Sequence, residues 1–120
     1  MKVRKINMKI IENKKNNNEV YAGKEIYKMT KSNSIKKMSE IDGVFGCLGF
    51  IYYEDEKTDG STVPILTIEA DTGEVFATNS ATFIRSFLDI YEMMQELPID
   101  IVVGHATSKK GRAFIFCDLA

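Results

Sequence analysis

Two central stretches of the chain have the apolar patterns of β-strands, one of them alternating with polar residues and the other almost continuous. Within residues 63–70, Leu66, Ile68 and Ala70 recur at every second position and therefore share one side of an extended backbone. Residues 44–53, VFGCLGFIYY, form an almost unbroken apolar run rich in aromatic side chains, and their glycines stand where a strand bends or bulges. We therefore predict two strands here, of which the first is long and curved.

The period of the pattern changes after Ser80. Phe83 and Phe87 recur at the spacing of one helix face, and Asn79 or Ser80 provides a capping side chain. The helix is predicted to end before Pro98. Shorter alternating segments predict four more strands, at residues 22–30, 74–78, 99–103 and 112–119.

These elements follow the order of an OB-fold. In that mainly β (α+β) architecture, a five-stranded barrel carries one helix between its third and fourth strands. The predicted elements fit this order if residues 74–78 form a small extra hairpin arm on the third strand. A generic α+β sheet with one helix gives the same list of elements, so both architectures are open at this point.

A chain of 120 residues has room for one domain, and its 44% of apolar residues can fill a single core. We assign residues 21–120 to this domain and residues 1–20 to a basic N-terminal extension. The apolar residues of the extension fit neither a strand nor a helix well, and they are too few to form a core of their own. The extension is therefore expected to dock on the barrel or to join another subunit, which would cause self-association.

Charge divides the chain into three parts, although the net charge is only −1. Residues 1–38 hold 11 Lys and Arg against 3 Asp and Glu, residues 39–105 hold 2 against 13, and residues 106–120 hold 3 against 1. This separation predicts a surface with a basic side that can meet a phosphate backbone. Within residues 1–18, biased composition alone also explains the enrichment in Lys, Asn and Ile.

Two clusters of basic residues fall on predicted loops. In an OB-fold, the loops between strands 1 and 2 and between strands 4 and 5 border the groove that binds oligonucleotides. The predicted loops at these two places carry six cations that we assign to phosphate binding: Lys31, Lys36, Lys37, Lys109, Lys110 and Arg112. Lysines also occur in loops for solubility alone, so neither cluster is decisive by itself.

Aromatic residues at predicted outward positions are candidate platforms on which bases stack. Every second residue from Ala113 to Leu119 is of core type, which places Phe114 and Phe116 on the opposite face of the last strand. By the same reasoning Phe76 points outward, and of two adjacent tyrosines Tyr53 is assigned to the site. Each stacked base contributes about 1–3 kcal/mol. The alternative is that these rings pack beneath a neighbouring loop or the N-terminal segment.

The sequence does not indicate catalytic or metal-binding chemistry. Cys47 and Cys117 stand in no CxxC or Cys/His cluster and are expected to be small buried residues. His105 has no partner at the spacing of a catalytic set and is expected to make a structural or backbone contact. We expect no cofactor, no metal and no enzymatic activity. The longest apolar run is far shorter than the roughly 20 residues of a membrane helix, so a soluble, cytoplasmic protein with no membrane contact is expected.

Two C-terminal stretches resemble part of a known family. Residues 66–94, LTIEADTGEVFATNSATFIRSFLDIYEMM, and residues 99–120, IDIVVGHATSKKGRAFIFCDLA, are similar to the C-terminal half of the single-stranded DNA-binding proteins of small tailed phages that copy linear genomes by protein priming. The shared features are an acidic turn, an outward aromatic where Phe76 stands, the helix, and a hairpin like residues 102–111. The resemblance implies cooperative, sequence-independent coating of displaced single-stranded DNA in the host bacterial cytoplasm, by rings that stack on bases. The basic extension departs from the family pattern and leaves the oligomeric state open.

The acidic middle of the chain is compatible with a second class of function. The acids from Asp42 to Asp100 would present phosphate-like charge to a host enzyme that acts on DNA, as in a protein-interaction inhibitor or DNA mimic. The two functions make opposite demands. The first protein binds oligonucleotides directly, whereas the second binds none and competes with them.

Overall fold

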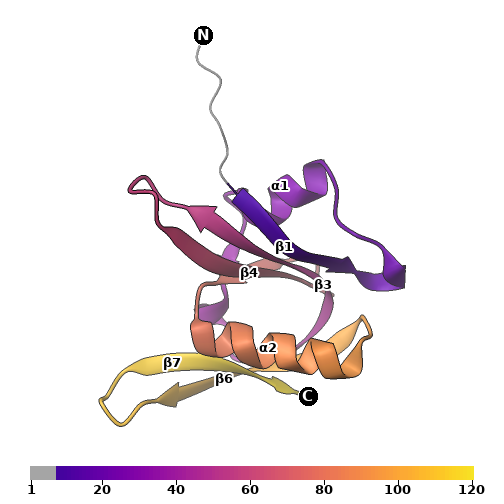
Figure 1. Cartoon of the computed structure of the whole chain (residues 1–120). Coiled ribbons are helices and arrows are strands. Elements are labelled where there is room, and N and C mark those ends of the chain that lie inside the picture. Colours follow the sequence, from indigo (N-terminus) through magenta and orange to yellow (C-terminus); the bar gives the residue numbers. More distant parts are fainter. Residues whose placement is uncertain (1–7) are drawn as a thin grey trace.

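The computed structural model describes residues 8–120, and the predictions made for residues 1–7 lie outside them. Its elements in chain order are β1 (Met8–Lys15), η1 (Asn16–Asn18), α1 (Lys24–Thr30), β2 (Lys36–Lys37), η2 (Met38–Glu40), β3 (Gly43–Glu56), β4 (Thr62–Ala70), β5 (Val75–Thr78), α2 (Ala81–Met94), β6 (Ile99–Thr107) and β7 (Ala113–Leu119). The seven strands join one curled, open sheet, a half-barrel that two α-helices accompany (Figure 1). The prediction of a mainly β fold is confirmed. Within residues 8–120, neither helix has the length and apolar character that crossing a membrane requires.

The long strand β3 is the centre of the sheet. β4 pairs antiparallel with one edge of β3, from Cys47 to Glu56. The other edge of β3 pairs first with β6, from Gly43 to Cys47, and then with β1, from Gly49 to Asp55. A register shift between Cys47 and Gly49 marks the bulge at which the strand bends, as the glycine pattern predicts. The remaining strands extend the sheet on both sides in the order β2-β5-β4-β3-β6-β7.

Residues 22–30, predicted to be a strand, contain helix α1 instead. In a strand Tyr27 and Met29 would share one face, but Tyr27 is 60% exposed whereas Met29 is buried. The side chains that turn inward are Ile26, Met29 and Thr30, which are spaced as on a helix face, and the intervening Lys and Glu residues favour helix. This short segment contains too few apolar residues to distinguish the strand period of two residues from the helical period of 3.6 residues.

The N-terminal segment contributes a strand to the sheet. Met8 and Ile10 of β1 pack against the buried cluster that includes Ile51 and Tyr53 of β3. The side-chain amide of Asn13 accepts a hydrogen bond from the N–H of Tyr21 and donates one to the carbonyl oxygen of Tyr21, each 2.8 Å long. Residues 8–15, assigned from the sequence to an extension, therefore lie within the folded sheet and not outside it.

Each face of the sheet carries a hydrophobic core. The inner core lies beneath α2, where the Phe50 ring of β3 is 4.9 Å from the rings of both Phe87 and Tyr91. The predicted helix is confirmed: α2 follows Ser80, whose Oγ accepts a hydrogen bond from the N–H of Phe83 (3.2 Å). The outer core lies beneath α1 and is formed by Tyr21, Met29, Ile51 and Tyr53.

Both cysteines are buried in the inner core, as predicted. Burial raises the pKa of the Cys117 thiol to about 12 and also raises the pKa of the Cys47 thiol. Because the thiolate is the reactive form, we expect both thiols of the folded protein to react with iodoacetamide at pH 8 at least about a hundredfold more slowly than in urea. Mass spectrometry of the alkylated chain measures this difference. Rapid modification of one cysteine in the folded state would contradict the described packing.

Candidate nucleic-acid interface

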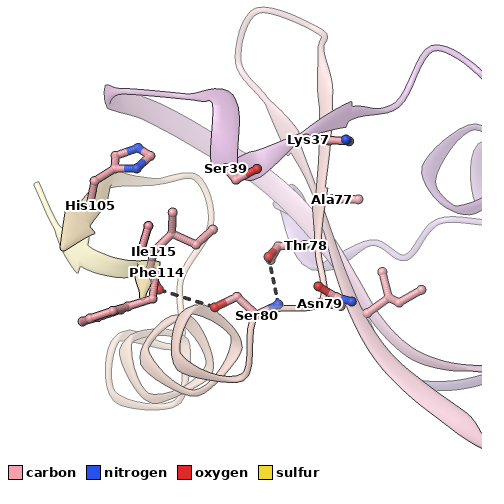
Figure 2. A pocket seen from close by; sticks show the side chains of 11 residues that line it. Lys37, Ser39, Ala77, Thr78, Asn79, Ser80, His105, Phe114 and Ile115 are labelled. Atoms are coloured by element: carbon pink, nitrogen blue, oxygen red, sulfur yellow. Dashed lines mark hydrogen bonds between the residues drawn. The ribbon is translucent and has the colours of Figure 1, made fainter. Parts of the chain in front are cut away.

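A cleft of about 580 Å³ separates β5 from β7 at the open side of the half-barrel (Figure 2). Residues from the two ends of the sheet and from the turn before α2 line it: Lys37, Ser39, Ile65, Ala77, Thr78, Asn79, Ser80, His105, Ala113, Phe114 and Ile115. Its volume lies in the range of natural ligand sites, which is about 300–1,000 Å³. The cleft depends on the tertiary fold, because no single segment supplies both of its walls.

The cleft stays open because α2 takes the place beside β7 that another strand would occupy. Ser80 Oγ donates to the carbonyl oxygen of Ile115 (3.4 Å), and Ser86 Oγ accepts from the N–H of Cys117 (2.9 Å). Thr78 Oγ1 accepts from the N–H of Ser80 (3.0 Å) and so fixes the turn from β5 into α2 (Figure 2). The backbone groups at a sheet edge need partners of this kind. As a result, β5 and β7 are not paired with each other.

The lining of the cleft differs in charge from the linings of other depressions on the described part of the protein. None of its lining residues, all of them between residues 37 and 115, is Asp or Glu. Four other depressions on the protein each include at least one carboxylate. The cleft presents a lysine, an imidazole, a carboxamide, three hydroxyl groups and the half-buried ring of Phe114. A polyanion can therefore approach this lining without meeting a carboxylate in it.

Four of the predicted phosphate-binding cations lie at the cleft or on the hairpin beside it. Lys37 lines the cleft because β2 pairs in parallel with β5. Lys109, Lys110 and Arg112 are exposed on the hairpin that joins β6 to β7, and both of these strands contribute to the cleft. In the part of the chain that the structure describes, none of the four forms an ion pair. Their charge is therefore free to attract phosphate.

Lys31 and Lys36 lie away from the cleft lining and are paired with carboxylates. Lys31 Nζ is 3.0 Å from Asp55 Oδ1 and 5.8 Å from the centre of the Tyr53 ring. Lys36 Nζ forms an ion pair with Glu74. Because residues 22–30 are helical, the segment that follows them does not join the first two strands of a barrel, so the predicted loop position of these lysines is wrong. Their pairing leaves less charge for phosphate than Lys37 retains.

Tyr53 and Phe76 are buried, and their prediction as outward stacking rings is wrong. Phe76 is only 8% exposed and packs in the inner core, with its ring centre 5.5 Å from that of Phe45. Tyr53 lies in the outer core, where its hydroxyl donates to the carbonyl oxygen of Thr30 (3.3 Å) and burial raises its pKa to about 12. Val75, the neighbour of Phe76, packs against the outer core. Since β5 is covered on both faces, alternation along it cannot identify a solvent side.

Phe114 and Phe116 point away from the inner core, as predicted. Their neighbours Ile115 and Cys117 are buried, whereas the two phenylalanines are half-buried with ring centres 6.4 Å apart. Phe116 lies across Gly104, where an added Cβ atom would collide with the ring. Phe114 extends to the rim of the cleft (Figure 2).

His105 makes the backbone contact expected from the sequence, because its Nε2 donates to the carbonyl oxygen of Ile41 (2.6 Å). Among residues 8–120, no three His, Cys, Asp or Glu side chains gather in a group that could hold a metal ion.

Sequence reasoning missed Ser39 and considered Asn79 only as a helix cap, yet both line the cleft. The sequence could have indicated Asn79 by its position between a predicted strand and a predicted helix, because a side chain at such a position lies at the end of the sheet.

No protein-family model matches the chain, and searches of curated proteins and of solved structures found no significant match. The interpretation of the cleft therefore depends on its own geometry and chemistry.

Proposed function

We propose that this protein binds single-stranded DNA along the cleft between β5 and β7, without preference for sequence. The observation that carries the proposal is a cleft whose lining, within the described chain, lacks carboxylates but has an aromatic rim and four nearby cations. Cations attract the phosphate backbone and rings stack on any base, so neither contact reads the sequence. In a phage of the kind that the sequence resembles, the protein would coat displaced strands in the cytoplasm of the infected bacterium.

We also propose that β3 to β7 form an OB-type barrel. An OB barrel has five strands in Greek-key order and is partly open. Here five strands that are consecutive in the chain lie in the spatial order β5-β4-β3-β6-β7. In chain order β5 is the third and β6 the fourth of these strands, and α2 lies between them. In this assignment the opening of the barrel lies between its third strand, β5, and its fifth strand, β7. The cleft lies between the same two strands. β1, β2 and α1 are then additions to the barrel.

The additions affect where a nucleic acid strand can bind. OB barrels bind oligonucleotides over their second and third strands and the adjoining loops. In this protein those strands are β4 and β5, and the outer core beneath α1 covers their outer surface. The hairpin at residues 108–112, which corresponds to the loop between the fourth and fifth strands, is exposed apart from the half-buried Ser108. Binding is therefore proposed at the seam beside this hairpin.

Titration of labelled oligo-dT at several salt concentrations tests the proposal. If Lys37, Lys109, Lys110 and Arg112 neutralise about four phosphates, log K should fall against log salt with a slope near −3, at about −0.7 per phosphate on a single strand. Lys37→Gln should make this slope shallower by about 0.7. Phe114→Ala should weaken binding by about 1–3 kcal/mol and leave the slope unchanged, because stacking releases no counterions.

Lys24→Gln is the matched control, because Lys24 is exposed on α1 and does not line the cleft. It should preserve both the affinity and the slope, and thermal melting should show that every variant is folded. An equal effect of Lys24→Gln and Lys37→Gln would contradict a localised site. If the chain binds no oligonucleotide at low salt but displaces DNA from a DNA-binding enzyme, the exposed acids at Asp89, Glu92 and Glu96 would support the DNA-mimic alternative instead.

A further inference from the structure

The outer face of the β6–β7 hairpin is not covered by any described element. In an antiparallel sheet, directly paired residues share a face. Six residue positions face away from the inner core and form what we call the outer ribbon face: Val44, Val102, Gly104, Ala106, Phe114 and Phe116. α2 lies over the opposite side of β6 and β7 (Figure 1). Val44 is 63% exposed, which is high for an apolar residue in a strand.

The outer ribbon face is apolar at its centre. The Phe116 ring lies over Gly104, and the centre of the Phe114 ring is 6.4 Å from that of Phe116. β6 has nine residues, so the face extends for roughly 30 Å at about 3.4 Å per residue. A contiguous apolar surface of this kind indicates a contact with another macromolecule.

Opposite charges lie at the two ends of this face. At one end, Asp118 pairs across the strands with Val102, and Asp100 pairs with Gly46. Both aspartates are exposed, and Asp71 lies beside Gly46 at the same end. At the other end, the hairpin turn carries three exposed cations: Lys109, Lys110 and Arg112. The outer ribbon face therefore has an acidic end, an apolar centre and a basic end.

This order of charges favours a second copy of the chain over a nucleic acid strand as the partner of the outer ribbon face. A nucleic acid strand laid along the whole face would bring phosphates against the acidic end, where like charges repel. A second copy of the chain laid antiparallel, with a two-fold axis near Gly104 and Phe116, would bring each basic end against the acidic end of its partner. The two apolar centres would then cover each other, so the face is complementary to itself.

We propose that two copies of this chain form a symmetric dimer through their outer ribbon faces. The proposal uses the charge order and the half-buried apolar centre that no described element covers, and it does not depend on the proposed function of the cleft. Phe114 is also proposed for base stacking, and Lys109, Lys110 and Arg112 for phosphate binding, so the test uses the protein without nucleic acid.

Sedimentation equilibrium of the full chain, from about 5 to about 500 µM protein, measures the dimer dissociation constant. We expect a reversible monomer–dimer equilibrium that shifts toward monomer as salt rises. Asp118→Lys should raise the dissociation constant about tenfold or more, because a single reversal makes two contacts of a symmetric interface repulsive. Lys110→Glu should have a similar effect. The double variant with both reversals should return the constant to within about threefold of the original value.

The control for the charge reversals is Glu56→Lys, which changes an exposed acid on the β3–β4 arm outside this face. This variant should dimerise like the original chain, and circular dichroism should show that all four variants are folded. The proposal is overturned if the original chain stays monomeric over the whole concentration range. It is equally overturned if the double variant dimerises no better than the single reversals, or if association appears only after an oligonucleotide is added.

Discussion

Replacement of Phe87 with alanine should lower the free energy of unfolding by about 3–5 kcal/mol, because the ring fills the centre of the inner core. Phe87 is fully buried on α2, and its ring meets that of Phe50 edge to face at 4.9 Å. Tyr91 of the same helix packs on Phe50 as well. The cavity left by the substitution would lie between helix and sheet, and the neighbours could close it only by moving α2. Urea unfolding followed by circular dichroism measures the loss.

Arg85→Ala provides the control for this substitution, because Arg85 is exposed on the same helix. Its free energy of unfolding should stay within about 0.5 kcal/mol of the original. Phe87→Leu, which retains most of the apolar volume, should fall between the two alanine variants. If Phe87→Ala unfolds at the same urea concentration as Arg85→Ala, the described packing of α2 on the inner core is incorrect.

Deletion of residues 1–15 should remove most of the stability of the domain, which for a single domain is about 5–15 kcal/mol. Without β1, the edge of β3 from Gly49 to Asp55 loses its backbone partners. The outer core loses Met8 and Ile10, and the backbone of Tyr21 loses both of its hydrogen bonds with Asn13. We expect the truncated chain to be largely unfolded, with poor dispersion of its amide NMR signals.

A shorter deletion of residues 1–7 is the matched control, since it leaves β1 complete. It removes three of the basic residues near the N-terminus but should preserve the NMR dispersion and the unfolding midpoint. The contrast separates the role of β1 from a general effect of shortening a basic terminus. A well-folded chain without residues 1–15 would show that β1 is dispensable to the sheet.

The strands and the helix with a long, regular pattern could be predicted from the sequence. Residues 63–70 alternate with a period of two, residues 44–53 form a long apolar run rich in aromatic residues, and α2 shows the helical period over several turns. Residues 8–15 and 22–30 were assigned incorrectly for a common reason. Each is short, lysine-rich and stabilised by tertiary partners that lie 20 or more residues away, such as the β3 edge for β1. Local pattern carries little information about such contacts.

The candidate site could be predicted only in part. The outward side of Phe114 and Phe116 followed from alternation, because β7 has one buried and one open face. The same reasoning failed for Phe76, because both faces of β5 are covered. Lys37 came to the cleft through the parallel pairing of β2 with β5, although the segment before it joins α1 to β2 and not two strands of a barrel. Pairings between distant segments decided which predicted residues meet.

The shared edge of β3 also has a consequence for the kinetics of folding. β1 and β6 occupy the same edge, although they come from opposite ends of the chain. During synthesis, β3 can pair with β1 and β4 as soon as these segments leave the ribosome, whereas the first part of β3 waits for β6, and the inner core waits for α2 and β7. The nascent chain therefore exposes a half-paired central strand until β6 and β7 emerge. Since long-range strand pairings dominate, folding is expected on the millisecond-to-second scale and not in microseconds.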